Sequence, residues 1–242
     1  MNDEPSRVAA RYTRRDAVAG RYSLLRPEVW QTVHERERAL LRRFAAEGIA
    51  DLAPLKLTEV GCGAGFNLLG LLRWGFAPEH LTGLELLPER HAQARRVLPA
   101  ATTLWLGDAT QAPVAPASQD LVLQATVFSS LLDDAFQQRL ADAMWSWLRP
   151  GGAVVWYDFA VGNPRNRDVR GVPMKRVRAL FPQASRIAVE RVTLAPPLAR
   201  AVCRWHPALY RLFNALPLLR THRLVWLAKP ASPSVGSRAR DQ

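Results

Sequence analysis

The feature that most constrains this chain is a glycine-rich turn between an apolar strand and a helix. The segment at positions 57–67 reads LTEVGCGAGFN, with glycines at 61, 63 and 65 and an acidic residue, Glu59, just before them. Glycine adopts positive φ at little cost and carries no Cβ, so such a turn lets the backbone approach a ligand closely. The sequence therefore predicts a ligand site on this turn.

The spacing of the glycines separates two classes of nucleotide-like ligand. A dinucleotide fingerprint needs its third glycine one position later, where this chain has Phe66. Glu59 would also repel a pyrophosphate, because both groups are negatively charged. A cationic ligand suits the turn better.

Four further segments occur in an order that resembles the class I S-adenosylmethionine-dependent methyltransferases. TGLEL at 82–86 is similar to the second strand of that family, LWLGDA at 104–109 to the third, the stretch 120–128 to the fourth, and LRPGG at 148–152 to the turn before the fifth. The resemblance implies a Rossmann-like α/β fold: a seven-stranded sheet in the order 3-2-1-4-5-7-6, with the last strand antiparallel and helices on both faces.

The resemblance also implies that S-adenosyl-L-methionine is the cofactor. Glu85 stands where the family holds the ribose hydroxyls, and Asp108 stands where it contacts the adenine. The residues expected to bind the cofactor are Glu59, Gly61, Cys62, Gly63, Gly65, Asn67, Glu85, Leu86, Asp108, Ala109 and Gln124.

The chain of 242 residues is expected to form one main domain. Helices and strands alternate after Gly65, which predicts a parallel sheet covered on both faces. We expect an N-terminal arm and a helix that packs on the core at 1–48, the methyltransferase domain at 49–229, and a disordered tail at 230–242. The N-terminal helix should begin at Pro27 and end near Gly48.

The segment 195–221 separates the last two strands, which the family usually joins by a short hairpin. Leu209, Leu212, Phe213 and Leu216 share one face of a helix expected there, and arginines stand at 200, 204, 211 and 220. Three interpretations stay open: a lid over the acceptor pocket, an interfacial helix that contacts membrane lipid, or a plain packing insertion.

The methyl acceptor is expected at the loops that leave the fourth and fifth strands, because ligands of open α/β sheets bind beyond the carboxyl ends of strands. These loops resemble those of bacterial small-molecule methyltransferases, which implies a small-molecule, glycan-linked or lipid-linked acceptor. The candidate acceptor contacts are Tyr12, Tyr22, Thr126, Phe128, Tyr157, Asn163, Arg165, Asn166 and Arg170.

Methyl transfer from a sulfonium is an in-line displacement that depends mainly on positioning. A hydroxyl acceptor would also need a general base, for which Asp158, His222 and His34 are candidates. Each has an ordinary structural alternative: a loop cap for Asp158, a turn residue for His222 and a solvated helix face for His34.

Positive charge gathers in the final third of the chain. The net charges of residues 1–50, 51–160 and 161–242 are +3, −4 and +13, which sum to +12. Such an excess could attract an anionic acceptor, an acidic membrane surface or nucleic acid. A compositional bias explains it equally well, because 30 of the 33 basic residues are arginine.

Other features narrow the range of partners. The fourth strand ends in QATV and lacks the motif of adenine-N6 enzymes, and no cysteine stands at a strand end for pyrimidine C5 chemistry, which argues against nucleic acid. The two cysteines have no metal-binding spacing, so no metal is expected.

Without a secretory or membrane-spanning apolar run, we expect a cytoplasmic protein, with peripheral contact to the inner membrane as an open alternative. The oligomeric state stays open, as does a non-catalytic adenosyl-binding role.

Overall fold

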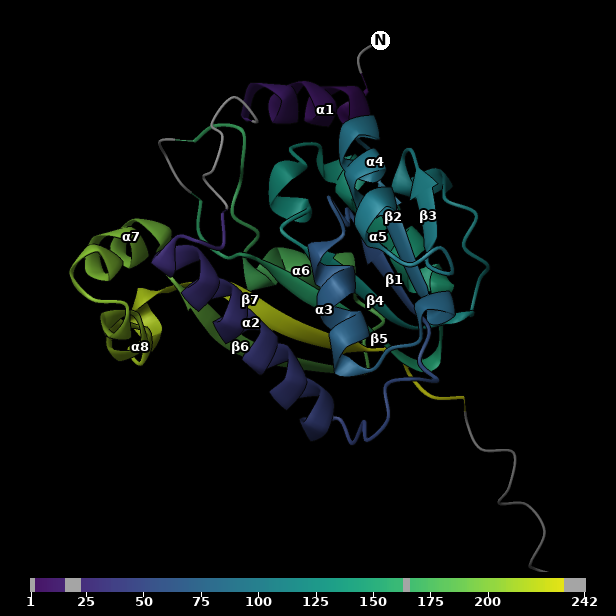
Figure 1. The fold of residues 1–242 in the computed structure, drawn as a ribbon. Coiled ribbons are helices and arrows are strands. Elements are labelled where there is room, and N and C mark those ends of the chain that lie inside the picture. The colour runs from purple at the N-terminus through teal and green to yellow at the C-terminus, as the bar shows by residue number, and fades with distance from the viewer. Residues whose placement is uncertain (1–2, 16–22, 163–165, 233–242) are drawn as a thin grey trace, which may run out of the picture.

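Seven strands form one sheet in the part of the chain that the computed structural model describes, residues 3–15, 23–162 and 166–232 (Figure 1). The order is β3-β2-β1-β4-β5-β7-β6, and β7 runs antiparallel to both of its neighbours, which confirms the predicted topology. The strands are β1 (Leu57–Val60), β2 (Leu81–Glu85), β3 (Thr103–Leu106), β4 (Gln119–Ala125), β5 (Leu148–Phe159), β6 (Arg186–Leu194) and β7 (Arg220–Ala228).

Helices cover both faces of the sheet, as expected for parallel strands joined by helical crossovers. The helices are α1 (Glu4–Arg15), α2 (Pro27–Ala46), α3 (Phe66–Trp74), α4 (Pro88–Val97), α5 (Asp134–Trp147), α6 (Met174–Leu180), α7 (Pro196–Trp205) and α8 (Ala208–Asn214). No helix in the described part combines the length and the apolar character needed to cross a membrane.

Two apolar cores fill the space between the sheet and its helices. Successive strand side chains point to opposite faces, so Val122 and Val154 contribute to one core while Leu123 and Val155 contribute to the other. The first core also takes in side chains of α5 and α6, and the second takes in side chains of α2, α3 and α4. The carboxyl ends of the parallel strands are therefore held between two packed layers.

The helix expected from Pro27 to Gly48 is α2, which begins at Pro27 and is followed by Gly48 at a φ of 75°. Ahead of it, the structure adds a helix that was not predicted, because α1 occupies residues 4–15 of the expected N-terminal arm. Its Val8 packs into the core that contains α5. The tail beyond residue 232 lies outside the described residues.

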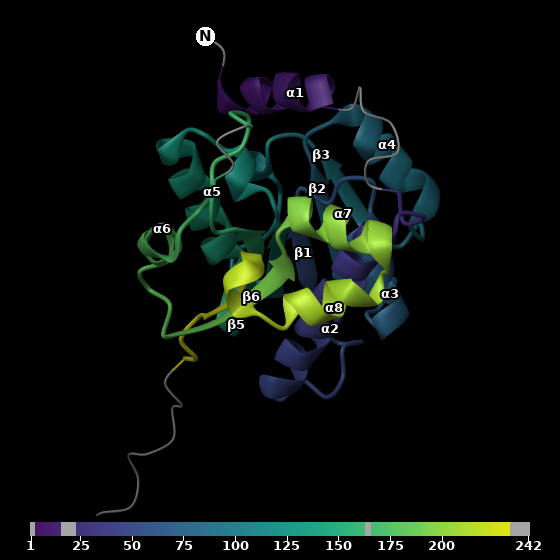
Figure 2. The ribbon, with the colours of Figure 1, turned by 90° about the vertical axis from the view of Figure 1, so that its left-hand side faces the viewer.

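The 195–221 insertion forms α7 and α8, which lie side by side on the outside of the molecule, beyond α2 and β6 (Figures 1 and 2). Its own apolar cluster includes Leu194, Ala199, Val202 and Tyr210. None of its residues lines the pocket at the strand ends described below. Its action as a lid stays a prediction.

A buried carboxylate on α2 holds this insertion in place. The carboxylate of Glu35 accepts hydrogen bonds from the Tyr210 hydroxyl at 3.1 Å and the Asn214 amide at 2.9 Å, both on α8. It also accepts the backbone N–H of Thr193 on β6 at 3.0 Å. One side chain thus joins a helix, a strand and the insertion.

Glu35→Ala should lower the free energy of unfolding by about 3–5 kcal/mol, because it leaves three buried donors without an acceptor. Glu37→Ala on the same helix is the matched control: Glu37 pairs with the largely exposed Arg73 at 2.8 Å, so this variant should lose less than ~1 kcal/mol. Urea unfolding followed by circular dichroism measures both. Equal losses would show that Glu35 does not hold the insertion.

Candidate cofactor site and active site

The glycine turn has the conformation that its sequence predicts. Gly61, Gly63 and Gly65 have φ values of 66°, 59° and 85°, which other residues rarely adopt. A Cβ on Gly61 would stand 2.7 Å from a methyl group of Val127, so this position is also sterically closed. Among the described residues, no atom lies within 4 Å of the point where a Cβ on Gly63 would stand. The backbone at Gly63 is therefore open to a ligand.

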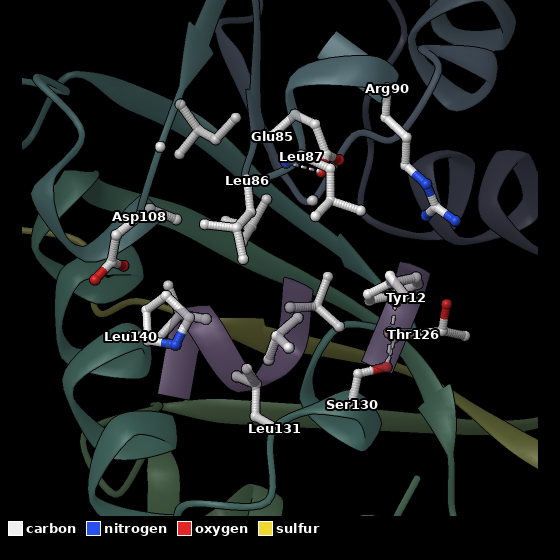
Figure 3. Close-up of a pocket in the computed structure, with 18 of the residues that line it drawn as sticks. Tyr12, Glu85, Leu86, Leu87, Arg90, Asp108, Thr126, Ser130, Leu131 and Leu140 are labelled. Atoms are coloured by element: carbon white, nitrogen blue, oxygen red, sulfur yellow. Dashed lines mark hydrogen bonds between the residues drawn. The ribbon is translucent and has the colours of Figure 1, made fainter. Parts of the chain in front are cut away.

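A pocket with about 820 Å³ of empty space, part of it open to solvent, lies at the carboxyl ends of the strands (Figure 3). Glu85 and Asp108 line it, as do Gly61, Leu86 and Ala109, all five of which the sequence analysis assigned to the cofactor. In Figure 3, Glu85 and Asp108 reach the pocket from different strand ends, with Leu86 between them. The structure thus brings together the residues predicted for ribose and adenine.

Glu85 fastens the glycine turn to the end of β2. One of its carboxylate oxygens accepts the backbone N–H of Gly63 at 2.7 Å, and the other accepts that of Leu87 at 2.8 Å. A carboxylate oxygen has two lone pairs, so each can accept a further bond from a ribose hydroxyl. Glu85 therefore suits the predicted role and also supports the turn.

Asp108 begins a short 3₁₀ turn that follows β3. Its carboxylate accepts the backbone N–H of Thr110 at 2.9 Å, which fixes the side chain at the pocket wall. Apolar side chains of α5, Phe136 and Leu140, line the same pocket. A carboxylate beside an apolar wall fits the flat, partly polar adenine ring.

Helix α1 forms one wall of the pocket. Pro5, Val8 and Tyr12 line the pocket, and the Tyr12 hydroxyl lies 3.3 Å from the Ser130 hydroxyl. The guanidinium of Arg90 lies 4.4 Å from the centre of the Tyr12 ring. The structure therefore places Tyr12 at the pocket, whereas Tyr22 lies outside the described residues.

The buried carboxylate of Glu4 fixes α1 in this position. It accepts the backbone N–H of Leu132 at 2.8 Å and pairs with Arg11 at 2.6 Å. Arg11 in turn donates to the carbonyl of Ser130 at 2.9 Å. Helix α1 was not predicted, although Val8 and Tyr12 stand four residues apart and so share a helical face.

Glu59 lies behind the glycine turn and does not line the pocket. One of its oxygens accepts the Asn67 amide at 2.6 Å, and the amide oxygen of Asn67 accepts a hydrogen bond from Arg36 at 2.6 Å. The other carboxylate oxygen is buried without a hydrogen-bond partner among the described residues. Such an orphaned acceptor fits a cationic cofactor group or a water that bridges to one.

Burial raises the pKa of Glu59 to about 7, against opposing effects of the Asn67 hydrogen bond and the charge of Arg36. The carboxylate is therefore only partly ionised at neutral pH. A cation that binds near it gains affinity as the carboxylate ionises.

Cys62 and Gln124 are also buried and do not line the pocket. The Gln124 side chain accepts the backbone N–H of Val127 at 3.1 Å and lies 3.4 Å from the carbonyl of Tyr157. It therefore supports the turn after β4, and its contact with the cofactor stays a prediction. The same turn holds Thr126 at a φ of 60°, and Thr126 lines the pocket.

Asp158 is buried behind the 3₁₀ turn Phe128–Ser130. Its carboxylate accepts the backbone N–H groups of Ser129 at 3.0 Å and Phe159 at 2.8 Å. Burial raises the pKa of Asp158 to about 6, although these hydrogen bonds act in the opposite direction. Asp158 does not line the pocket, so its position fits a residue that caps the turn as well as it fits a general base.

His222 is buried against aromatic rings. It stacks on Tyr157 with ring centres 4.9 Å apart, and its pairing partner across the sheet is Phe159. Burial, with a smaller effect of Arg36, lowers the pKa of His222 to about 3. Asp158 precedes Phe159 on β5, so its side chain points to the opposite face of the sheet and does not pair with His222. His34 is exposed on α2.

The other residues predicted to contact the acceptor lie at different places in the structure, and those that it describes do not line the pocket. Phe128 is fully buried and packs on Trp156 with ring centres 4.5 Å apart. The Tyr157 hydroxyl lies 2.8 Å from the Thr193 hydroxyl. Arg170 pairs with Asp134, and Asn166 accepts the backbone N–H of Asp168 at 3.1 Å. Asn163 and Arg165 lie outside the described residues.

Sequence comparisons agree with this geometry. Residues 58–152 match the family described as a methyltransferase domain. The tRNA N(3)-methylcytidine methyltransferase Mettl2 of Drosophila melanogaster is 28% identical over 123 residues, which is 46% of this chain and 36% of that protein. The chain thus covers little more than a third of this curated relative.

Solved structures with the same fold are more distant in sequence. A S-adenosylmethionine-dependent methyltransferase from Mesorhizobium loti has a TM-score of 0.56 at 17% identity, over 80% of this chain and 96% of its own. Phosphoethanolamine N-methyltransferase 2 of Haemonchus contortus, solved with S-adenosyl-L-methionine, has a TM-score of 0.60 at 17% identity. The match covers 81% of this chain and 52% of that one. The [4+2]-cyclase SpnF shares the fold with a TM-score of 0.53 at 16% identity. The match covers 81% of this chain and 82% of that one.

The match over residues 58–152 shows that this chain contains a methyltransferase domain, and the strand order is that of the class I S-adenosylmethionine-dependent methyltransferase fold.

Glu85→Ala should raise the dissociation constant of S-adenosylmethionine about 100-fold, because it would remove the two charge-assisted bonds predicted to the ribose and does remove the anchor of Gly63. Glu89→Ala, an exposed carboxylate on α4, is the control and should leave the affinity unchanged. Isothermal titration calorimetry measures both constants. An unaltered constant in Glu85→Ala would reject the ribose assignment.

The dissociation constant of S-adenosylmethionine should fall as the pH rises from 6 to 7.5. Glu59, with its pKa near 7, gains negative charge over this range and attracts the cationic cofactor. Glu59→Gln cannot ionise and should lose this dependence while binding weakly throughout. Titrations at several pH values test this, and the same slope in both proteins would exclude Glu59 as its source.

Proposed function

We propose that this chain transfers a methyl group from S-adenosylmethionine to an oxygen of a small-molecule, glycan-linked or lipid-linked acceptor. One observation carries the proposal: the pocket wall opposite Asp108 bears the neutral hydroxyls of Tyr12, Thr126 and Ser130, and the Arg90 guanidinium on the same side lies over the Tyr12 ring (Figure 3). Neutral hydrogen-bonding groups suit a hydroxyl acceptor better than a charged one. We also infer a cytoplasmic location for the reaction.

The bound cofactor supplies an electrophilic methyl group on a positively charged sulfur. An acceptor oxygen would bond to that methyl carbon as the carbon–sulfur bond broke, and the electron pair of the broken bond would stay on sulfur. The acceptor proton passes to a base or to water. The protein contributes mainly by holding the acceptor in line, which can supply several kcal/mol. Tyr12 and Ser130, which lie within hydrogen-bonding distance of each other, are placed to do so.

Asp158 suits the role of general base better than His222. With its pKa near 6, Asp158 is ionised at neutral pH. His222, with its pKa near 3, is neutral but a weak base. Asp158 also accepts the backbone N–H of Ser129, whose neighbour Ser130 lines the pocket.

If Asp158 is the base, turnover should rise with pH through about 6, as the carboxylate loses its proton. Asp158→Asn should remove this rise and lower kcat by about 10²–10⁴-fold, with little change in the KM for the cofactor. Thermal unfolding is measured alongside, because the same carboxylate also caps a turn. A variant that loses stability but keeps the pH profile would show a cap and no base.

Methylation of RNA is the second candidate, and one finding favours it: the partial likeness to a tRNA methyltransferase. The net charge of +13 in residues 161–242 is compatible with such a substrate. The neutral hydroxyls at the pocket and the QATV end of β4 favour the small acceptor.

Two measurements test the proposed function. Thermal unfolding with and without S-adenosylmethionine reports cofactor binding, since a ligand at 100 times its dissociation constant adds ~2.7 kcal/mol of stability. Transfer of a radioactive methyl group to separated lipid, polysaccharide, small-molecule and RNA fractions then reports the acceptor. Label in the RNA fraction alone would replace the proposal with the second candidate.

A further inference from the structure

The outer side of the insertion exposes large apolar side chains. Trp205 at the end of α7 is 87% exposed, Leu212 on α8 is 65% exposed, and Leu216 and Leu218 beyond α8 are 56% and 87% exposed. Single exposed apolar residues are common on protein surfaces, but four within 14 positions form a concentration that needs an explanation.

The charge of the same segment has only one sign. Residues 195–221 contain four arginines and no aspartate or glutamate. Arg200 and Arg204 on α7 and Arg211 on α8 are exposed. Apolar side chains interspersed with arginines, with no acidic residue, are typical of a surface that binds anionic lipid.

The inner side of the insertion is fixed, so these apolar side chains cannot turn inward. Tyr210 and Asn214 are held by Glu35, and the Gln31 side chain of α2 donates to the carbonyl of Pro207 at 2.9 Å. Val202 of α7 is packed in the apolar cluster under the helices. In Figure 2, α7 and α8 lie side by side in front of the sheet, with nothing drawn in front of them.

A second pocket beside α8 adds a polar subsite to this surface. It has about 540 Å³ of empty space, part of it open to solvent, and its lining includes Arg38, Arg42, Arg211 and Arg220. Glu190, also in the lining, pairs with Arg42 at 2.9 Å.

Two arginines of this pocket remain for an anion. Arg38 and Arg211 have no ion-pair partner among the described residues. Glu35 also lines the pocket, but its carboxylate already accepts hydrogen bonds from Tyr210 and Asn214. A phosphate group at this pocket would pair with the guanidinium groups of Arg38 and Arg211.

We propose that the outer face of the α7–α8 insertion docks on a bilayer that contains anionic phospholipid, with Trp205 and the three leucines at the acyl boundary and the arginines at the phosphates. Three exposed leucines favour lipid over RNA, because single-stranded nucleic acid selects aromatic stacking platforms. The inference rests on the proposed function only in that a lipid-linked acceptor would be met at this surface.

Binding to vesicles tests the proposal without any methyl transfer. The full chain is sedimented with vesicles of phosphatidylcholine alone and with vesicles in which about a third is phosphatidylglycerol. We expect binding to the mixed vesicles and little to the neutral ones. Arg204→Gln with Arg211→Gln should weaken that binding by roughly 25-fold, at about fivefold for each charge. Trp205→Ala with Leu218→Ser should weaken it by roughly tenfold or more.

Arg95→Gln with Val97→Ser on α4, an exposed basic and apolar pair on a helix away from α7 and α8 (Figure 1), is the matched control and should bind as the unaltered protein does. Thermal unfolding confirms that each variant is folded, and the cofactor affinity should be unchanged in all three. The proposal is overturned if the unaltered protein ignores anionic vesicles, if the insertion variants bind like the control, or if they lose affinity for tRNA but not for vesicles. Because cofactor binding is measured separately, a failed cofactor site and a failed lipid site give different results.

Discussion

The cofactor site depends on the carboxylate of Glu85, which holds the glycine turn against the end of β2. Its two oxygens accept the backbone N–H groups of Gly63 and Leu87, so the turn and the entry to α4 are tied to one side chain. The three glycines make the turn conformationally accessible, but positive φ alone does not fix where it stands. A group expected only to bind ribose therefore also builds the surface on which the rest of the ligand would lie.

Helix α2 connects this site to the opposite end of the sheet through two consecutive residues. Arg36 holds Asn67 at the start of α3, and Asn67 holds the buried Glu59 behind the glycine turn. Its neighbour Glu35 holds β6 and α8. Adjacent residues of a helix point in different directions, about 100° apart, so one helix can position the cofactor turn and the insertion independently. The Glu35 link is buried and the Arg36 link is partly buried, and both are charge-assisted, which makes them specific in geometry.

The fold could be predicted largely from the sequence, because glycine spacing and strand-end acids occur in a family order that fixes the sheet. Glu85 and Asp108 line one pocket for the same reason, and their cofactor roles stay predictions. The positions of side chains that depend on packing could not be predicted from the sequence. Phe128 lies three residues after the end of β4, in the loop where an acceptor contact is expected, but its ring packs in the core against Trp156. Likewise α1 could not be assigned to the pocket, because the bonds that hold it run from Glu4 and Arg11 to residues 130–132, more than a hundred positions away.

The positions of α1 and the insertion bear on two of the interpretations that were open for residues 195–221, a lid over the pocket and a contact with membrane lipid. The cover over the cofactor pocket is α1, whose Val8 and Tyr12 line the pocket. The insertion instead packs its polar and apolar inner side on α2 and β6 and turns Trp205, Leu212 and Leu218 outward. A segment that closed over a ligand would direct its apolar residues toward that ligand, since burial of apolar surface would be what drives closure. The outward direction of these side chains therefore fits a contact outside the molecule better than closure of the pocket.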